Sequence, residues 1–203
     1  MKGVQEYIES GILQAYVFGL ATPEEERSIE VMARRHAEVR EAIEAFEYDL
    51  EKYAMANAVT PDPTIKPFLI ATIDYTERME KGEPPSYPAM LQEDSRIEDY
   101  KEWLKRSDMQ LPDDFKNFHA KIINYIPGAL TAIIWIKDAA PWEMHDHEFE
   151  KFLVVEGTCD IVIEDETHRL KAGDYLSIPL HKKHTVKVTS DVPCKAILQR
   201  IAA

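Results

Sequence analysis

Apolar positions in the first 59 residues recur at helical spacing. The first series has a spacing of four and consists of Val4, Ile8, Ile12, Tyr16 and Leu20. This series predicts a helix, and Gly19 is placed to end it. We expect a second helix to begin at once, because Thr22 is a good N-cap and Glu25 completes a capping box around a first-turn proline, Pro23.

A third apolar series alternates spacings of four and three, and it consists of Val39, Ile43, Phe46, Leu50 and Tyr53. Such a series predicts a long helix with one apolar face. Two interpretations of that face stay open. It is the ordinary core of a helical bundle, or it is a surface that binds another protein, in which case the contact residues are Val39, Ile43, Phe46 and Leu50.

Prolines and glycines divide the middle of the chain. Pro61 and Pro63 end the long helix, and a short apolar helix is predicted over residues 67–79. A Gly- and Pro-rich stretch after it is typical of a linker between domains, and another helix is expected at about residues 94–105. The predicted domains are a helical domain at 1–80, a linker at 81–93, and a second domain with a leading helix at 94–203.

From His119 onward the hydrophobic period changes from helical spacing to two. Turn signals separate eight predicted strands, at residues 118–126, 129–137, 150–156, 158–164, 167–171, 174–178, 184–189 and 194–201. Eight short strands in so few residues predict a closed or sandwiched antiparallel barrel. The fold class is therefore α+β, with an N-terminal all-α helical bundle followed by a C-terminal all-β barrel.

Charge and composition narrow the function. The formal net charge is −13, with 37 Asp and Glu against 24 Lys and Arg, which argues against direct nucleic-acid binding and suits a basic partner. The two cysteines, Cys159 and Cys194, lack the spacing of a disulfide framework or a zinc knuckle. The longest apolar run, residues 129–136, is shorter than the ~20 residues of a membrane span. We expect a soluble protein in the cytoplasm.

Histidines and glutamates cluster in the barrel half of the sequence. His145, His147 and Glu150 lie close together, and another histidine, His184, follows a Gly-Asp turn. Alternate side chains of an extended strand share one face, so His145 and His147 are predicted to point at one spot with Glu150 beside them. Imidazoles and a carboxylate that converge inside an apolar barrel make a site for a divalent transition metal.

Residues 145–157 and 173–184 resemble the two cupin motifs, which implies a double-stranded β-helix, or jelly-roll, barrel. The resemblance implies four metal ligands, namely His145, His147, Glu150 and His184. Only two residues separate His147 from Glu150, where the family has three or four, so Glu148 remains an alternative ligand. Imidazole and carboxylate ligands suit Zn, Fe, Mn or Ni, so the residue types do not distinguish among these ions. Candidates for a supporting layer or pocket are His181, Glu148, Trp142 and Tyr175.

The helical half carries a second resemblance. Residues 13–26, with Ala15-Tyr16 followed by Gly19-Leu20 and an acidic capped helix, resemble the opening of anti-sigma domains. An anti-sigma domain joined to a cupin is similar to the ChrR-type anti-sigma factors, whose helices occlude a sigma factor and whose cupin is tied to release under oxidative stress. The zinc positions of related domains align here with Met32, His36 and Val39, so no zinc is expected in the helical domain.

The leading hypothesis is a cytoplasmic anti-sigma factor and transcription regulator of a stress response. Its helices would bind an extracytoplasmic-function (ECF) type sigma factor, and its metal-binding cupin would sense a small molecule or oxidant. The alternative is a metal-dependent cupin enzyme, a dioxygenase or isomerase, with a helical dimerisation domain. The enzyme is the less favoured hypothesis. The sequence has no paired acid and base that would indicate a particular reaction, so no catalytic residue is proposed. The sequence does not determine which metal binds or which signal is sensed. A homodimer formed through the cupin also remains an open alternative.

Overall fold

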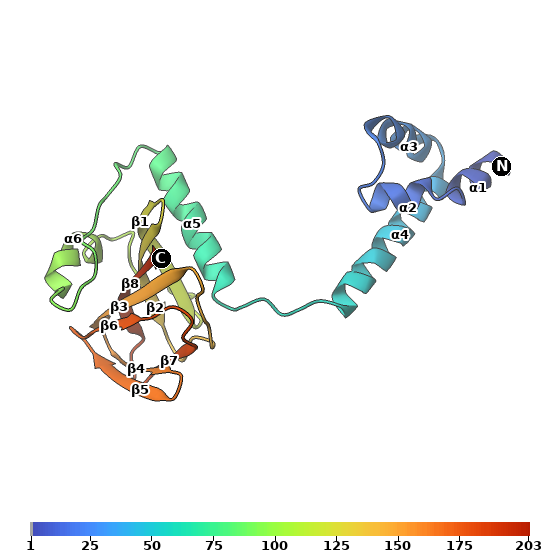
Figure 1. Ribbon diagram of the computed structural model, residues 1–203. Helices are drawn as coiled ribbons and strands as arrows, with labels where there is room; N and C mark the ends of the chain where they lie inside the picture. The colour runs from blue at the N-terminus through green and yellow to red at the C-terminus, as the bar shows by residue number, and fades with distance from the viewer. Residues whose placement is uncertain (1) are drawn as a thin grey trace. The chain divides into compact units, whose positions relative to one another are not determined.

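The computed structural model describes residues 2–203, and the chain divides into two compact units, Met1–Thr60 and Pro61–Ala203. Figure 1 shows helices in the first unit and a strand-rich second unit. Each unit has buried residues of its own. None of the helices within residues 2–203 combines the length and apolar composition that a membrane span requires.

The first unit is a small helical bundle. Its helices are α1 (Lys2–Ile8), α2 (Ile12–Val17), α3 (Pro23–Arg35) and α4 (Ala37–Ala56). Leu13 from α2, Ile29 from α3 and Val39 from α4 are fully buried and form its centre. Most members of the two apolar series therefore meet in one core, whereas Leu20 and Tyr53 at their ends are exposed.

Two features of the helix boundaries have clear local causes. The single helix predicted through residue 20 is two helices, because Gly11 adopts a left-handed φ of 86° that interrupts the helical path. The capping box at the start of α3 is confirmed. The Thr22 side chain accepts a hydrogen bond from the Glu25 amide at 3.3 Å, and the Thr22 amide donates to the Glu25 carboxylate at 2.8 Å.

The second unit contains all eight predicted strands, in two antiparallel sheets. The strands are β1 (Phe118–Ile126), β2 (Ala129–Ile136), β3 (Glu148–Glu156), β4 (Thr158–Ile163), β5 (Glu166–Lys171), β6 (Tyr175–Ile178), β7 (His184–Val188) and β8 (Cys194–Ala202). One sheet has the order β1-β2-β8-β3-β6, and the other has the order β5-β4-β7. The predicted α+β class, with helices first and an antiparallel β-sandwich second, is confirmed.

Alternation along the strands produces two apolar layers. Ile134 and Ile136 of β2 face the interior between the sheets, where they join Phe152, Leu198 and other buried residues. Ile133 and Trp135 point the other way, into a second core on the outer face of the larger sheet. Residues from the segment before β1 cover that outer face, among them Leu91, Tyr100, Trp103 and Met109.

Helix α5 (Ile65–Glu80) belongs to the second compact unit, whereas the sequence prediction placed it in the helical domain that ends at residue 80. Its buried Ala71 and partly buried Phe68 and Tyr75 join the core between the sheets. Arg78 also donates a hydrogen bond to the main-chain oxygen of Ile122 in β1. The helix docks there because its apolar side chains are removed from water against the inner face at β1.

The segment predicted as an inter-domain linker, 81–93, also lies within the second unit. It contains no helix or strand, yet Leu91 is fully buried and its amide donates to the Gln199 side chain at 2.7 Å. The following helix is shorter than predicted and has two parts, η1 (Ile97–Tyr100) and α6 (Lys101–Leu104). Buried contacts rather than flexibility therefore decide the path of this segment.

Candidate metal centre

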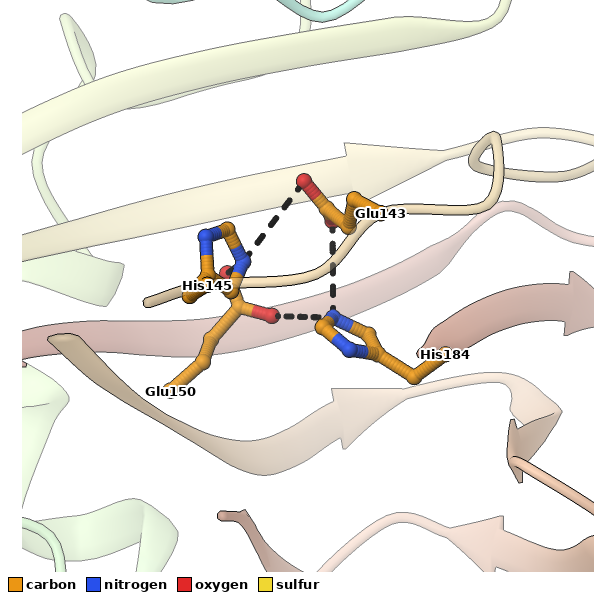
Figure 2. Close-up of side chains that lie close together, drawn as sticks. All are labelled: Glu143, His145, Glu150 and His184. Carbon is orange, nitrogen blue, oxygen red and sulfur yellow. Dashed lines mark hydrogen bonds and ion pairs between the residues drawn. The ribbon is translucent and has the colours of Figure 1, made fainter. Parts of the chain in front are cut away.

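Four side chains of the second unit converge on one point. Glu143, His145, Glu150 and His184 each offer one potential ligand atom, and these atoms all lie within 4.8 Å of one another. Figure 2 shows the two carboxylates and two imidazoles pointing toward each other. Glu150 and His184 come from β3 and β7, which belong to different sheets, so the cluster lies where the sheets face each other.

Local backbone structure explains why these side chains meet. Glu143 forms an isolated antiparallel bridge with His184, with two main-chain hydrogen bonds of 2.9 Å. The extended chain at Glu143 directs it and His145, two residues on, toward the same side. Glu150 is 1% exposed and shares the inner face of β3 with Phe152 and Val154. The pleat of β3 thus places a carboxylate inside an otherwise apolar layer.

The buried carboxylate of Glu150 is held ionised by its neighbours. Burial alone raises the pKa of a carboxyl group, but the imidazoles of His145 and His184 and the charge of Arg200 hold the pKa of Glu150 well below its usual range. Arg200 Nε lies 2.8 Å from one oxygen of Glu150, and His184 Nε2 lies 3.0 Å from the other. A negative charge is therefore available inside the barrel for a cation.

His184 is arranged to present one particular nitrogen to the cluster. Its Nδ1 lies 3.0 Å from the main-chain oxygen of Lys182, so Nδ1–H donates there and Nε2 faces Glu150. Burial lowers the pKa of an imidazole, but the nearby carboxylates of Glu143 and Glu150 outweigh burial and raise the pKa of His184 to about 10. A carbonyl partner that fixes the tautomer in this way is typical of a metal-ligating histidine.

The nitrogen His145 Nε2 shows that these residues fit a metal ion. It is buried and has no hydrogen-bond partner among the described residues, which is rare for a buried polar atom. It lies 3.7 Å from a carboxylate oxygen of both Glu143 and Glu150, which is too long for a hydrogen bond. A divalent ion bound among these atoms would satisfy the nitrogen and balance the two carboxylates.

The ligand set differs from the one that the sequence implied. His145, Glu150 and His184 lie in the cluster, but His147 is exposed and lies outside it. The chain bends at Asp146 and His147 before β3 begins at Glu148, so the expected strand alternation from His145 to His147 is broken. Glu143, two residues before His145, takes the fourth place.

The four residues proposed for a supporting layer have different positions. Glu148 lies beside the cluster, with one oxygen 3.6 Å from His145 Nδ1. His181 is exposed and bonds to Asp146 at 3.1 Å, while Trp142 is 49% exposed beneath the Lys183 amine. Tyr175 packs against the outer core, on the opposite side of the sheet from the cluster.

Sequence reasoning missed Glu143 and Arg200. Glu143 precedes His145 by two residues, so the same alternation argument could have identified it if the strand had been taken to end before His147. Arg200 lies on β8 and contacts the cluster through strand pairing, because Arg200 and Glu150 are opposite each other in the register of β3 and β8. No local signal in the sequence marks such a pairing.

The predicted partner-binding face of α4 divides into two parts. Val39 is fully buried, and Ile43 and Phe46 pack against the bundle core, so the N-terminal part of this face belongs to the interior of the bundle. Phe46 and Leu50 also line an open pocket of about 350 Å³, together with Gln14, Val17, Phe18, Asp49 and Tyr53. Of the positions aligned with a zinc motif, Met32 and Val39 pack in the same core and His36 precedes α4.

Comparison with known proteins identifies the domain that carries the cluster. Residues 132–199 match the family described as a cupin domain, so the second unit contains a cupin domain. The ligand cluster lies inside this match. No curated protein matches the chain.

Solved structures match part of this chain at low sequence identity. A putative mannose-6-phosphate isomerase from Ralstonia eutropha is 22% identical and covers 46% of this chain and 92% of its own, with a TM-score of 0.43. A cupin-2 domain protein from Shewanella frigidimarina is 19% identical, with 50% and 98% covered and a TM-score of 0.42. KdgF from Halomonas is 19% identical, with 46% and 87% covered and a TM-score of 0.41.

Proposed function

We propose that this chain is a regulatory protein with two working parts. Its cupin domain binds a divalent transition metal and senses a small molecule or oxidant, and its helical unit sequesters an ECF-type sigma factor. The proposal rests on one observation: the same chain has a four-residue ligand cluster in one compact unit and an open apolar pocket on the other, helical unit. The resemblance of residues 13–26 to the opening of anti-sigma domains is the reason for proposing a sigma factor as the partner.

The donor set of the cluster supports the metal. Two imidazoles and two carboxylates suit Zn, Fe, Mn or Ni, and selection among these ions depends on geometry and supply. The unpartnered Nε2 of His145 and the fixed tautomer of His184 are the features that a bound ion explains best. The metal would hold the two sheets together, because its ligands come from both.

The pocket of the helical unit supports a basic, amphipathic partner segment. Apolar side chains of Val17, Phe18 and Leu50 line it, and Phe18 is 60% exposed. Asp49 stands at the same pocket. A helix with apolar residues on one side and Lys or Arg beside them would fill the pocket and pair with Asp49.

The space inside the barrel favours a small oxidant over an organic molecule, whether as signal or as substrate. The cavity beside Glu143, Glu150 and Arg200 has a volume of about 10 Å³, which is roughly the room that one water molecule needs. A cytoplasmic location belongs to the same proposal, because the sigma factor acts there and both cysteines are free thiols.

The sigma-binding proposal is tested with the intact protein and two matched variants. Phe18→Glu places a charge in the pocket, and Tyr48→Glu changes a residue of similar exposure, 61% against 60%, outside the pocket lining. We expect Phe18→Glu to weaken co-purification with the ECF sigma factor encoded beside this gene by at least about tenfold, because buried apolar anchors dominate such interfaces. Tyr48→Glu should bind like the wild type. Absence of binding by the wild type refutes the proposal.

The ligand set is tested by metal titration. Glu143→Gln is expected to weaken Co²⁺ affinity by roughly 10- to 100-fold, because it removes a charged ligand atom. His147→Ala is the matched control and should stay within about twofold of the wild type, since its side chain lies outside the cluster. Isothermal titration calorimetry measures both. The reverse result would restore the ligand set that the sequence implied.

A further inference from the structure

Arg200 touches both carboxylates of the metal centre. Its Nε lies 2.8 Å from Glu150 Oε1, and its terminal nitrogen lies 3.3 Å from Glu143 Oε2. The other oxygen of each carboxylate faces His184 Nε2, at 3.0 Å for Glu150 and 3.7 Å for Glu143. Each glutamate therefore presents one oxygen to the Arg200 guanidinium and its other oxygen to the His184 imidazole. The two oxygens that face Arg200 also lie 3.7 Å from His145 Nε2.

We infer that Arg200 is a positioning residue that makes Glu143 and Glu150 single-oxygen ligands and thereby selects the class of metal. The inference rests on the metal binding proposed above. A guanidinium is a planar fork of donors that engages carboxylate oxygens in fixed directions. With one oxygen of each carboxylate engaged, the cluster offers two oxygens and two imidazole nitrogens to an ion.

Such a donor set discriminates against Ca²⁺. Calcium takes six to eight oxygen ligands and commonly binds carboxylates through both oxygens, whereas imidazole suits transition ions. Arg200 prevents Glu143 and Glu150 from binding an ion through both carboxylate oxygens. His145 and His184 supply nitrogen ligands instead of further oxygens. The centre is thus selective for a transition ion over an oxygen-seeking cation of the same charge.

Phe68 of α5 orients the guanidinium. The Arg200 Cζ lies 4.9 Å from the centre of the Phe68 ring, and that ring packs against Phe118 at 5.5 Å between centroids. An aromatic ring covering one face of a guanidinium leaves its in-plane N–H groups free for the carboxylates. Phe68 and Thr64 also line the small cavity beside the cluster. Helix α5 therefore contributes to metal selectivity without supplying a ligand.

The test compares affinities for Co²⁺ and Ca²⁺ in the full-length protein. Both ions carry two charges, so loss of one positive charge affects both alike, and the affinity ratio isolates geometry. The variants are R200Q, R200K, which keeps the charge but loses the fork, and F68L, which keeps apolar bulk but loses the ring. L69A is the control, because Leu69 lies on the same helix and is 58% exposed.

Visible absorption of bound Co²⁺ gives its affinity directly, and displacement by Ca²⁺ gives the ratio. We expect the Co²⁺ to Ca²⁺ ratio to fall about tenfold in R200Q and R200K and about threefold in F68L, in line with other residues that orient ligands. L69A should keep the wild-type ratio. Melting temperatures of the Co²⁺-loaded proteins check that each variant is folded.

Three results overturn the inference. An unchanged ratio in folded R200Q shows that Arg200 contributes only charge, and a fall in R200K no larger than in L69A gives the same answer. A ratio that falls equally in L69A assigns the effect to general loosening of α5. Absence of Co²⁺ binding by the wild type removes this inference and the metal-binding proposal together, while leaving the sigma-binding test unaffected.

Discussion

At the scale of the residue, the main feature is the number of charges placed inside the barrel. Glu150 is 1% exposed, and taking an isolated carboxylate out of water would be strongly unfavourable. The structure offsets this cost with three neighbours, since His145, His184 and Arg200 all lie within 3.7 Å of its oxygens. Removal of any one neighbour leaves charge uncompensated, which makes the cluster sensitive to pH and to metal.

The metal-free protein should lose stability as the pH rises above neutrality. The pKa of His184 is about 10 in the folded protein against an ordinary value of 6.5. A raised pKa means that the imidazolium stabilises the fold fully below pH 6.5 and that this contribution is lost as the pH rises toward 10. Urea unfolding should show a decrease on the order of 2 kcal/mol between pH 6.5 and 9.

A control variant separates His184 from other groups that titrate in this range. His181→Asn alters an exposed histidine near the cluster and should keep the same pH dependence. His184→Gln should lose it. Equal unfolding free energies of the wild type at the two pH values would contradict the assignment of a protonated His184.

At the scale of the element, turns decide how the strands reach the site. The turn between β3 and β4 uses Gly157, which has a φ of 76°. A Cβ there would lie 2.8 Å from the Ser190 hydroxyl, 3.1 Å from the Pro193 oxygen and 3.2 Å from the Cys194 Cα. Glycine is therefore required both by the left-handed conformation and by close packing of the backbone.

Gly157→Ala should destabilise the cupin domain by about 2–4 kcal/mol, because backbone strain and steric overlap add. Gly173→Ala is the matched control, since Gly173 also has a positive φ of 94° but has open space around it. That variant should cost about 1–2 kcal/mol from conformation alone. Thermal unfolding measures both, and equal losses would show that packing at Gly157 has no role.

At the scale of the whole molecule, the chain contains two units that divide after Thr60. Helix α5 follows this division directly, and its Phe68, Ala71 and Tyr75 contribute to the core of the second unit. The same helix approaches the metal centre through Phe68 and Arg200. The segment that joins the units is therefore connected, through α5, to the ligands of the cluster.

The division predicts how fragments behave. A fragment of residues 61–203 should fold with the stability of that unit in the full chain. A fragment of residues 81–203 should be less stable by about 4 kcal/mol or more, because burial of a large apolar side chain contributes about 1.5–3 kcal/mol. Urea unfolding followed by circular dichroism compares the fragments. Equal stability of the two would return α5 to the helical domain, as the sequence suggested.

Local signals in the sequence predicted the strands, most of the helices and most of the candidate cluster. Period-two alternation identified all eight strands, and the capping box at Thr22 identified the start of α3. His145, Glu150 and His184 were selected from ligand type and motif spacing, and the structure brings them together. These features are readable because each depends on residues close together in the chain.

The remaining features could not be predicted from the sequence, because they depend on contacts between residues that lie far apart along the chain. A bend at Asp146 and His147 turned His147 outward and admitted Glu143 through its bridge to His184. Strand register placed Arg200 opposite Glu150, and the apolar side of α5 was buried against the barrel rather than in the bundle. Spacing along the chain contains no information on which of two available surfaces a helix will cover, whereas packing selects one of them.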